Sequence, residues 1–304
     1  MTAEPVIDAQ DTLATAVVPP TVRASLSPSR AADFKTCPLL YRFRTIDRLP
    51  ERPTVEQVRG TLVHAVLERL FDLPAPARTP QSAGDLVAPQ WDRLVTEQPE
   101  LAGLFAEGDE AAVAEFLRSA AALLEGYFAV EDPRRLEPAE REALISAVVD
   151  DELLIRGYLD RLDVAPDGAL RVVDYKTGGA PREAFEARAL FQLKFYALVL
   201  WRTRGVVPRV LRLLYLRDAE VCDYSPDADE LLRFERTVVA LWQAIEQATE
   251  RQDFRPRPSR LCDWCSHQAH CPSFGGTPPP FPVTTTADPL RDARSRPAAP
   301  GADE

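Results

Sequence analysis

Two acidic residues and a lysine lie close to one short turn in the middle of the chain. Asp160 precedes the tripeptide Pro166-Asp167-Gly168, and Asp174 and Lys176 follow it. A proline followed two residues later by a glycine is typical of a three-residue hairpin loop, because proline starts a type I turn and glycine accepts the left-handed position. The flanking runs are rich in β-branched and apolar residues, so we expect two antiparallel strands.

The loop determines which residues face each other across this predicted hairpin. Pairing Ala165 with Ala169 puts Asp160 directly opposite Asp174. Lys176 follows two residues later and therefore points to the same face of the sheet. That face is otherwise apolar and is expected to lie on the core side. The two acids and the lysine would then gather at the open end of a buried sheet face.

This arrangement suggests a metal site. Two carboxylates this close repel each other unless a cation lies between them, and Mg²⁺ or Mn²⁺ prefers carboxylate oxygens as ligands. A lysine beside such an ion can orient a water molecule and stabilise charge that develops on a phosphate. Lys35, Lys176 and Lys194 are the only lysines, which makes Lys176 a candidate for ammonium chemistry. The alternative is a hairpin end in solvent, with hydrated acids.

Cysteines form a second candidate site. The sequence Cys262-x2-Cys265-x5-Cys271 brings three thiols together but lacks one ligand for a tetrahedral ion. His267 or His270 could supply the fourth ligand of a zinc ion. A 4Fe-4S cluster would need a fourth cysteine, and Cys37 is present far upstream. The remaining cysteine, Cys222, is expected to be a buried structural thiol.

Composition limits the class of protein. The 304 residues are 45% apolar and 27% charged, which allows a large core in one or two domains. The sequence contains no apolar run near the roughly 20 residues of a membrane span and does not begin like a secretory signal, so we expect a cytoplasmic protein with reduced thiols. A net charge of −11 argues against non-specific coating of nucleic acid. Basic stretches near residues 23–60 and 251–260 could follow a phosphate backbone, or could simply be solvated.

The order of predicted elements places both candidate sites between two polar, proline-containing ends. Residues 1–24 and 273–304 are expected to be disordered. Ser27 and Pro28 predict the start of a short helix. Helices are expected at 29–36, 55–71, within 85–130, at 182–203 and at 230–251, and strands at 143–149, 153–165, 169–175 and 209–216. The helical region before residue 130 is either an inserted lobe or part of the same domain.

The motifs around the hairpin resemble those of the PD-(D/E)xK nuclease superfamily, and in particular its RecB-like branch. The matching segments are Leu26-Ser27-Pro28-Ser29, Cys37-Pro38, Gly60-Thr61-Leu62-Val63-His64, Gly157-Tyr158-Leu159-Asp160-Arg161, Asp174-Tyr175-Lys176-Thr177-Gly178 and Gln192-Leu193-Lys194-Phe195-Tyr196. The resemblance extends from about residue 26 to 272. It implies an α/β, restriction-endonuclease-like core, with a mixed central sheet flanked by helices, a helical N-terminal part and a C-terminal Fe-S segment. The implied domain covers 25–272, with helices at about 55–130, the core at about 137–251 and the cysteines at 262–271.

The resemblance also implies roles for individual residues. The implied metal ligands are His64, Asp160, Asp174 and the backbone carbonyl of Tyr175; Lys176 is the implied catalytic lysine, and Gln192 and Tyr196 would support the site or contact DNA. Without the resemblance, His64 could be an ordinary residue on a helix face, and Gln192 and Tyr196 ordinary buried polar groups. One of Glu137, Glu140 or Glu142 matches an acidic position of relatives, and the sequence does not select among them.

The same branch includes AddB-type and CRISPR-associated nucleases with one cysteine before the core and three after it. The pattern of Cys37, Cys262, Cys265 and Cys271 is similar, and this implies a 4Fe-4S cluster rather than zinc. Such a cluster would close a loop of more than 200 residues. Long loops gain most from closure in the simple entropic description, so the cluster would act as a structural staple.

The function implied is a metal-dependent DNA nuclease that hydrolyses phosphodiester bonds in repair or recombination, more an exonuclease than an endonuclease. Mg²⁺ or Mn²⁺ would be its cofactor and single-stranded DNA or DNA ends its substrate. The alternative is a catalytically silent DNA-binding module, or a structural subunit of a helicase–nuclease complex stapled by zinc or Fe-S. The sequence has no G-x-x-x-x-G-K-[ST] motif, so a helicase would be a separate subunit.

Overall fold

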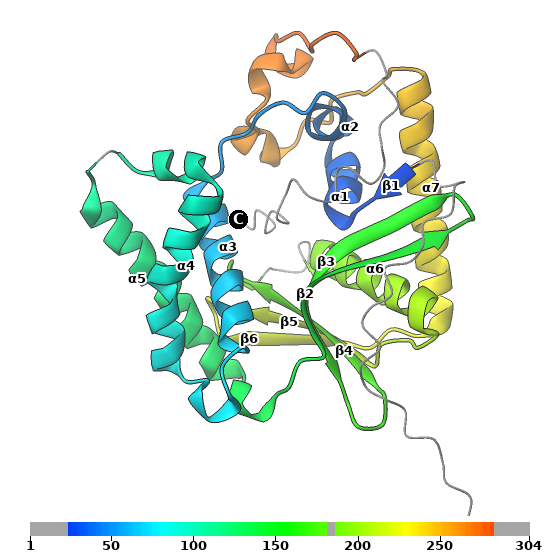
Figure 1. The fold of residues 1–304 in the computed structure, drawn as a ribbon. Helices are drawn as coiled ribbons and strands as arrows, with labels where there is room; N and C mark the ends of the chain where they lie inside the picture. The colour runs from blue at the N-terminus through cyan, green and yellow to red at the C-terminus, as the bar shows by residue number, and fades with distance from the viewer. Residues whose placement is uncertain (1–23, 107, 181–185, 283–304) are drawn as a thin grey trace, which may run out of the picture.

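A mixed, six-stranded sheet forms the centre of the computed structural model, which describes residues 24–106, 108–180 and 186–282 (Figure 1). The strands are β1 (Ala24–Leu26), β2 (Glu140–Val149), β3 (Leu153–Val164), β4 (Leu170–Lys176), β5 (Val210–Tyr215) and β6 (Glu220–Tyr224). Strand β2 is antiparallel to β3 along one edge, and β1 and β4 share the other edge of β3. Strand β5 is parallel to β4, and β6 completes the sheet. The predicted α/β class with a mixed central sheet is confirmed.

The β3–β4 hairpin has the register that its loop predicts. The backbone N–H of Ala165 donates to the carbonyl of Ala169 at 2.9 Å, and Gly168 takes a φ of 81°, in the left-handed region. Regular pairing continues from Val164 opposite Leu170 to Arg161 opposite Val173. It therefore ends one position before Asp160 and Asp174, which extend the same register.

The β2–β3 hairpin brings a third acid to this row. Its pairing runs from Val149 opposite Leu153 to Glu140 opposite Leu162, with Glu142 left out of the ladder. Glu142 has a φ of 44°, which few non-glycine residues adopt, so the strand is locally distorted there. The same register places Glu142 beside Asp160.

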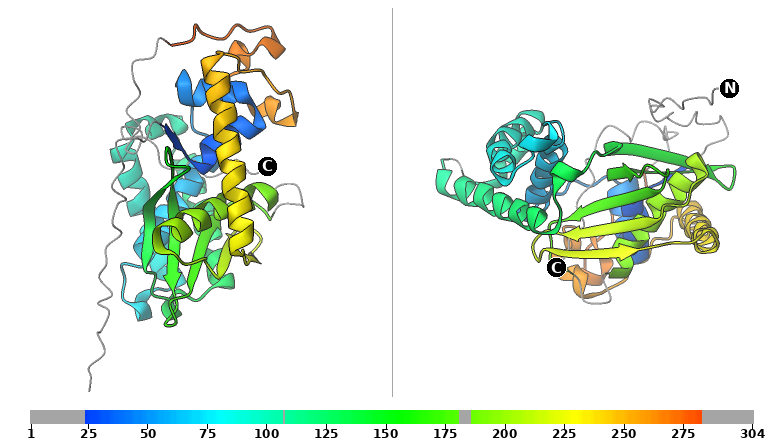
Figure 2. Two further views of the ribbon diagram at one scale, coloured as in Figure 1. Left: turned by 90° about the vertical axis from the view of Figure 1, so that its right-hand side faces the viewer. Right: turned by 90° about the horizontal axis from the view of Figure 1, so that it is seen from below.

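Helices cover both faces of the sheet (Figures 1 and 2). They are α1 (Pro28–Thr36), α2 (Pro38–Tyr41), α3 (Val55–Leu70), α4 (Pro80–Glu97), α5 (Glu110–Val130), α6 (Glu186–Arg204) and α7 (Ala228–Glu250). Short turns are a π-helix at Arg42–Ile46 and 3-10 helices at Ala75–Ala77, Pro99–Leu104, Pro133–Arg135, Arg260–Trp264, Gln268–His270 and Pro272–Phe274. Helix α4 starts earlier than the expected residue 85, because Thr79 caps it and Pro80 takes its first position.

Two apolar clusters correspond to the two faces. On one face, Leu162 and Val172 pack in the same core as residues of α6 and α7. On the other face, Val173 and Tyr175 pack against the lobe formed by α3, α4 and α5. The predicted helical region is therefore a lobe that buries the second face of the sheet. The acids and Lys176 lie on the α6 side.

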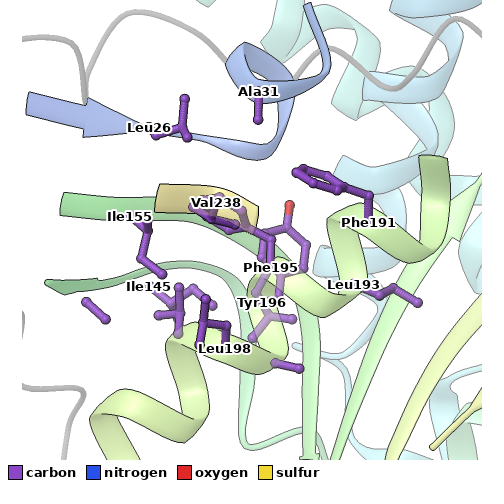
Figure 3. Packing of buried hydrophobic residues seen from close by; sticks show 14 of the residues in the cluster. Leu26, Ala31, Ile145, Ile155, Phe191, Leu193, Phe195, Tyr196, Leu198 and Val238 are labelled. Atoms are coloured by element: carbon purple, nitrogen blue, oxygen red, sulfur yellow. The ribbon is translucent and has the colours of Figure 1, made fainter. Parts of the chain in front are cut away.

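Helix α1 and strand β1 close the α6 side of the core (Figure 3). Ser27 caps α1 by accepting a hydrogen bond from the Arg30 backbone, and Pro28 occupies the first turn, as predicted. Leu26 and Ala31 are fully buried with Phe195 and Tyr196 of α6. This packing explains why α6 is apolar nearly all round.

The C-terminal part of the described chain returns to the N-terminal helices. Phe281 stacks on Phe254 with ring centroids 6.1 Å apart, and Arg42 donates to the Pro279 carbonyl. Pro279 and Phe281 thus lie against the core, so the disorder predicted from residue 273 is not found in residues 273–282. The predicted leader up to residue 23 and the tail from 283 lie outside the described residues. No helix in the described ranges is both long and apolar enough to cross a membrane.

Candidate active site

The central acids lie where β3 and β4 stop pairing. The Asp160 carboxylate accepts the backbone N–H of Tyr175 at 2.7 Å, so a side chain bridges the two strands at this point. Asp160 is 9% exposed and Asp174 is 2% exposed. Two carboxylates buried side by side at the end of a ladder are costly unless cationic groups face them.

Lys176 is one such group. Its Nζ lies 2.7 Å from Asp174 Oδ2 and donates a hydrogen bond of 3.0 Å to Gln192 Oε1. Gln192 Nε2 in turn donates to the hydroxyl of Tyr196 at 2.9 Å. Gln192 and Tyr196 are one turn apart on α6, as their spacing predicts. The structure therefore places both residues in a chain of hydrogen bonds that ends at Lys176.

His64 approaches the acids from the opposite lobe. Helix α3 begins with a capping box formed by Thr54 and Gln57, which sets the start of the helix that carries His64. His64 Nε2 lies 3.0 Å from the carbonyl oxygen of Tyr175, and a carbonyl can only accept, so this nitrogen carries the proton. His64 Nδ1 faces the carboxylates of Asp160 at 3.6 Å and Glu142 at 3.5 Å.

Burial and charge oppose each other at this histidine. Burial alone would lower the pKa of His64, but the carboxylates of Asp160 and Glu142 raise it to about 9. Burial raises the pKa of Asp160, and the nearby carboxylates of Asp174 and Glu142 add to that rise while His64 opposes it. Asp160 therefore needs positive charge nearby to stay ionised, and His64 supplies part of it.

His64, Glu142 and Asp160 form a compact set of metal-binding groups, with one ligand atom from each lying within 4.8 Å of the others. Oxygen and imidazole ligands of this kind suit a divalent ion such as Mg²⁺ or Mn²⁺. Asp174 is not in the compact set, because its carboxylate lies on Lys176. The Tyr175 carbonyl lies next to the set, in contact with His64. The donor chemistry fits the ion that the sequence suggests.

Comparison with known proteins supports this interpretation of the motifs. The sequence pattern of the PD-(D/E)XK nuclease superfamily matches residues 25–272. The chain belongs to this superfamily. It is 25% identical over 272 residues to the Gene 69 protein of Mycobacterium phage D29, which covers 82% of this chain and 96% of that protein. A stretch of 127 residues is 29% identical to the Gene 69 protein of Mycobacterium phage L5, which covers 41% of each.

The fold has a counterpart among solved structures. A crystal structure named "Putative exonuclease", from Eubacterium rectale, superposes with a TM-score of 0.51 at 12% identity, over 80% of this chain and 87% of that one. At this identity the likeness shows the fold alone. It agrees with the α/β architecture of this PD-(D/E)XK protein.

Among the three candidate glutamates, the structure selects Glu142. Glu137 pairs with Arg78 at 3.1 Å and Glu140 pairs with Arg204, both away from the acids. The turn at residues 150–152 is the sequence signal that could have identified Glu142. Pairing counted from this turn puts Glu142 beside Asp160, just as pairing counted from the turn at 166–168 puts Asp174 opposite Asp160. The positive φ at Glu142 has no counterpart in the sequence pattern.

Glu142→Gln is expected to weaken Mn²⁺ binding by more than about tenfold, because it removes one charged ligand while keeping the shape of the side chain. Calorimetric titration of the metal-free protein with Mn²⁺ measures the effect. Glu137→Gln is the matched control and should leave the affinity unchanged. Equal losses in both variants would contradict the selection of Glu142.

A buried arginine supports the site from the lobe side. Arg161 is completely buried and makes paired hydrogen bonds to Glu131, the C-cap residue of α5, at 2.6 and 2.8 Å. It also donates to Asp163 and to the hydroxyl of Tyr175, the latter at 2.8 Å. Arg161 thus ties Tyr175, whose backbone contacts both Asp160 and His64, to the α5 lobe. Arginine suits this role because its rigid fork bonds several oxygens at once.

The four predicted ligand cysteines line one cavity of about 50 Å³. Cys37 follows α1, and Cys262, Cys265 and Cys271 come from the segment after α7 (Figure 1). The backbone N–H groups of Arg257 and Ser259 donate to the sulfurs of Cys37 and Cys262, each at 3.3 Å. Burial raises the pKa of the Cys265 thiol. Cys222 lies apart on β6 and packs at the margin of the core.

His267, a candidate zinc ligand in the sequence, has a different partner. Its ring is 2% exposed, and Nε2 lies 2.6 Å from Glu51. Glu51 also accepts from Arg44 at 2.8 Å, and Arg44 bonds Asp33 of α1 at 2.7 Å. Phe43 packs edge-on against the His267 ring at 5.4 Å. These contacts attach the cysteine segment to the N-terminal helices without any metal.

The Glu51 network predicts a loss of stability in acid. Burial would raise the pKa of Glu51, but hydrogen bonds from His267 and Arg44 hold it at about 2. Because this folded-state pKa is below the value of about 4.5 in the unfolded chain, the stabilisation is complete above pH 5 and declines as the pH falls towards 2. The stability advantage of the wild type over Glu51→Gln should shrink by about 2 kcal/mol between pH 6 and pH 3.

Urea unfolding of both proteins at the two pH values measures this change. Glu56→Gln, at an exposed position of α3, is the matched control, and the change with pH for Glu51→Gln should exceed the change for Glu56→Gln. If the difference in unfolding free energy between the wild type and Glu51→Gln does not change with pH, this network does not hold Glu51 in its ionised form.

Proposed function

We propose that this chain is a Mg²⁺- or Mn²⁺-dependent deoxyribonuclease of the RecB-like branch, acting as an exonuclease. The observation that carries the proposal is the convergence of Asp160, Asp174 and Lys176 with His64 and Glu142 in one partly buried site. Carboxylates, an imidazole and a lysine in this arrangement are suited to hydrolysis of a phosphodiester bond.

The residues have separate tasks in this proposal. His64, Glu142 and Asp160, with Asp174 and the Tyr175 carbonyl at the border, would hold the ion. When bound, such an ion lowers the pKa of a water molecule and stabilises negative charge on phosphate oxygens. Asp174 and Gln192 hold the ammonium group of Lys176 in a fixed place. From there its charge stabilises the phosphate as negative charge builds up in the transition state.

DNA ends are the proposed substrate. The RecB-like motifs and the exonuclease name of the E. rectale structure support DNA cleavage from an end. In the basic stretch 251–260, the exposed Arg257 lines the cysteine cavity and donates to the carbonyl of Lys35 near the end of α1. Positive charge on a chain that is acidic overall suits contact with a phosphate backbone. Repair or recombination remains the proposed setting.

We propose that Cys37, Cys262, Cys265 and Cys271 hold a 4Fe-4S cluster. Their sulfurs surround a shared cavity, and within the described residues no three of them lie within 4.8 Å of one another. A tetrahedral zinc with bonds of 2.3 Å needs sulfurs about 3.8 Å apart, so the spacing suits a larger group. The contact of His267 with Glu51 also favours Cys37 as the fourth ligand.

A catalytically silent subunit of a helicase–nuclease complex is the second candidate. It is disfavoured because Lys176 lies 2.7 Å from Asp174, beside the compact set of His64, Glu142 and Asp160, an arrangement that a silent subunit does not need. A separate helicase remains compatible with an active nuclease, since the proposed chemistry does not require a motor within this chain.

Digestion of end-labelled single-stranded and duplex DNA, with Mg²⁺, Mn²⁺ or EDTA, tests the proposal. We expect metal-dependent release of short products from linear DNA and none from a circular single strand. Cleavage of the circle at the same rate would overturn the exonuclease assignment. Absence of cleavage in every metal, together with retained DNA binding, would favour the silent subunit.

A further inference from the structure

Gly157 occupies a crowded position in the middle of β3. It lies in the stretch 156–160, between the residues that pair with β1 and those that pair with β4. A Cβ atom built on Gly157 would lie 2.7 Å from Cε1 of Tyr196 and 3.3 Å from Cδ of Pro28. Its φ is not in the left-handed region, so the backbone does not require glycine. The requirement is space for the Tyr196 ring.

The Tyr196 ring is confined on its other sides as well. Tyr196 is 2% exposed and belongs to the same cluster as Ala31 of α1 and Phe191 of α6 (Figure 3). Close-packed interiors yield little when an atom is added. A methyl group at Gly157 would therefore displace the ring or the strand that carries Asp160.

The Tyr196 hydroxyl holds the Gln192 amide in place beside Lys176. Gln192 Nε2 donates to the Tyr196 hydroxyl at 2.9 Å, and this leaves Oε1 towards Lys176 Nζ at 3.0 Å. An ammonium group only donates hydrogen bonds, so it needs the oxygen of the amide. A reversed amide would present an NH₂ group to the ammonium and lose the contact.

We propose that Gly157 is a positioning residue for Lys176: its missing side chain admits the Tyr196 ring, whose hydroxyl holds the Gln192 amide within hydrogen-bond distance of the lysine. The effect passes through Tyr196, so Gly157 itself touches no reacting atom. The link to turnover rests on the proposed nuclease function, whereas the link to the Lys176–Gln192 contact does not.

A double-mutant cycle tests the proposal. Gly157→Ala and Tyr196→Leu should each lower kcat for DNA cleavage by about 10- to 100-fold, because a small misplacement of a reacting group costs about this much, with KM little changed. The combined Gly157→Ala/Tyr196→Leu variant should be no slower than Tyr196→Leu alone, because the ring that clashes is gone. The proposal would be overturned if the kcat losses of the two single variants multiply in the double variant, or if Gly157→Ala keeps the wild-type kcat.

A control and a second readout separate positioning from stability and from the proposed function. Leu198→Ala, in the same buried cluster as Tyr196, should lower the melting temperature while the folded enzyme keeps its kcat. In a crystal structure of Gly157→Ala, Lys176 Nζ and Gln192 Oε1 should lie beyond hydrogen-bond distance. An intact contact would refute the proposal whether or not the wild type cleaves DNA, and an inactive wild type would refute only the nuclease function. If Gly157→Ala does not fold, folding of the double variant identifies the ring as the obstacle, and an unfolded double variant contradicts the proposal.

Discussion

Lys176→Met and Asp174→Asn are each expected to reduce DNA cleavage by about 10²- to 10³-fold. Lys176 and His64 lie directly on the central carboxylates. Methionine keeps much of the length of the side chain but removes the charge that would face the phosphate. Asparagine keeps the shape of Asp174 but cannot neutralise Lys176 or approach a divalent ion as an anion.

Single-turnover cleavage of a labelled strand in Mn²⁺ measures both losses without interference from product release. Lys194→Met is the matched control, because Lys194 pairs with Glu230 of α7 and not with the acids. Its rate should equal that of the wild type. Full activity of Asp174→Asn with Mn²⁺ would remove Asp174 from the mechanism.

Cys37→Ala is expected to remove the proposed cluster and to destabilise the fold. Cys37 is separated by more than 200 residues from the other three cysteines, so the cluster closes a very long loop. By analogy with a disulfide, closing a loop of this length stabilises the folded state by about 5 kcal/mol, which corresponds to roughly 10–20 °C in melting temperature. Cys262→Ala should have the same effect.

Iron and sulfide content, absorbance near about 400 nm and the melting temperature together measure the result. Cys222→Ala is the control and should retain iron, colour and nearly all stability, because Cys222 lies on β6 away from the cavity. A colourless wild type with one zinc per chain, unaffected by Cys37→Ala, would contradict the cluster.

Local sequence signals predicted the part of the site that depends on turns. The loop at residues 166–168 set the register that aligns Asp160 with Asp174, and helical spacing placed Gln192 and Tyr196 together. Glu142 was not selected, because three glutamates are close in sequence and only the β2–β3 pairing distinguishes them. Its distorted backbone also depends on the strands around it rather than on neighbouring residue types.

Contacts between distant segments explain the rest. The second face of the hairpin carries Arg161 and Asp163, and the carboxylate of Glu131, the C-cap residue of α5, allows Arg161 to be fully buried there. His267 looked like a metal ligand by its position beside the cysteines, yet its partner Glu51 lies 216 residues away. Ion pairs over such distances leave no periodic pattern in the sequence.

The cysteine cavity has a consequence for the order of folding. One wall comes from α1 and Cys37, and the other from the segment that follows α7, so the hydrogen bond from Arg257 to Cys37 joins residues 220 positions apart. Contacts of such separation form slowly, because the entropy of closing the loop must be overcome before any of them is made. During synthesis, the contact between Cys37 and Arg257 therefore cannot form until nearly the whole domain has emerged from the ribosome. We expect closure of this cavity to be a late step of folding, after the helical lobe and the β2–β4 hairpins have assembled.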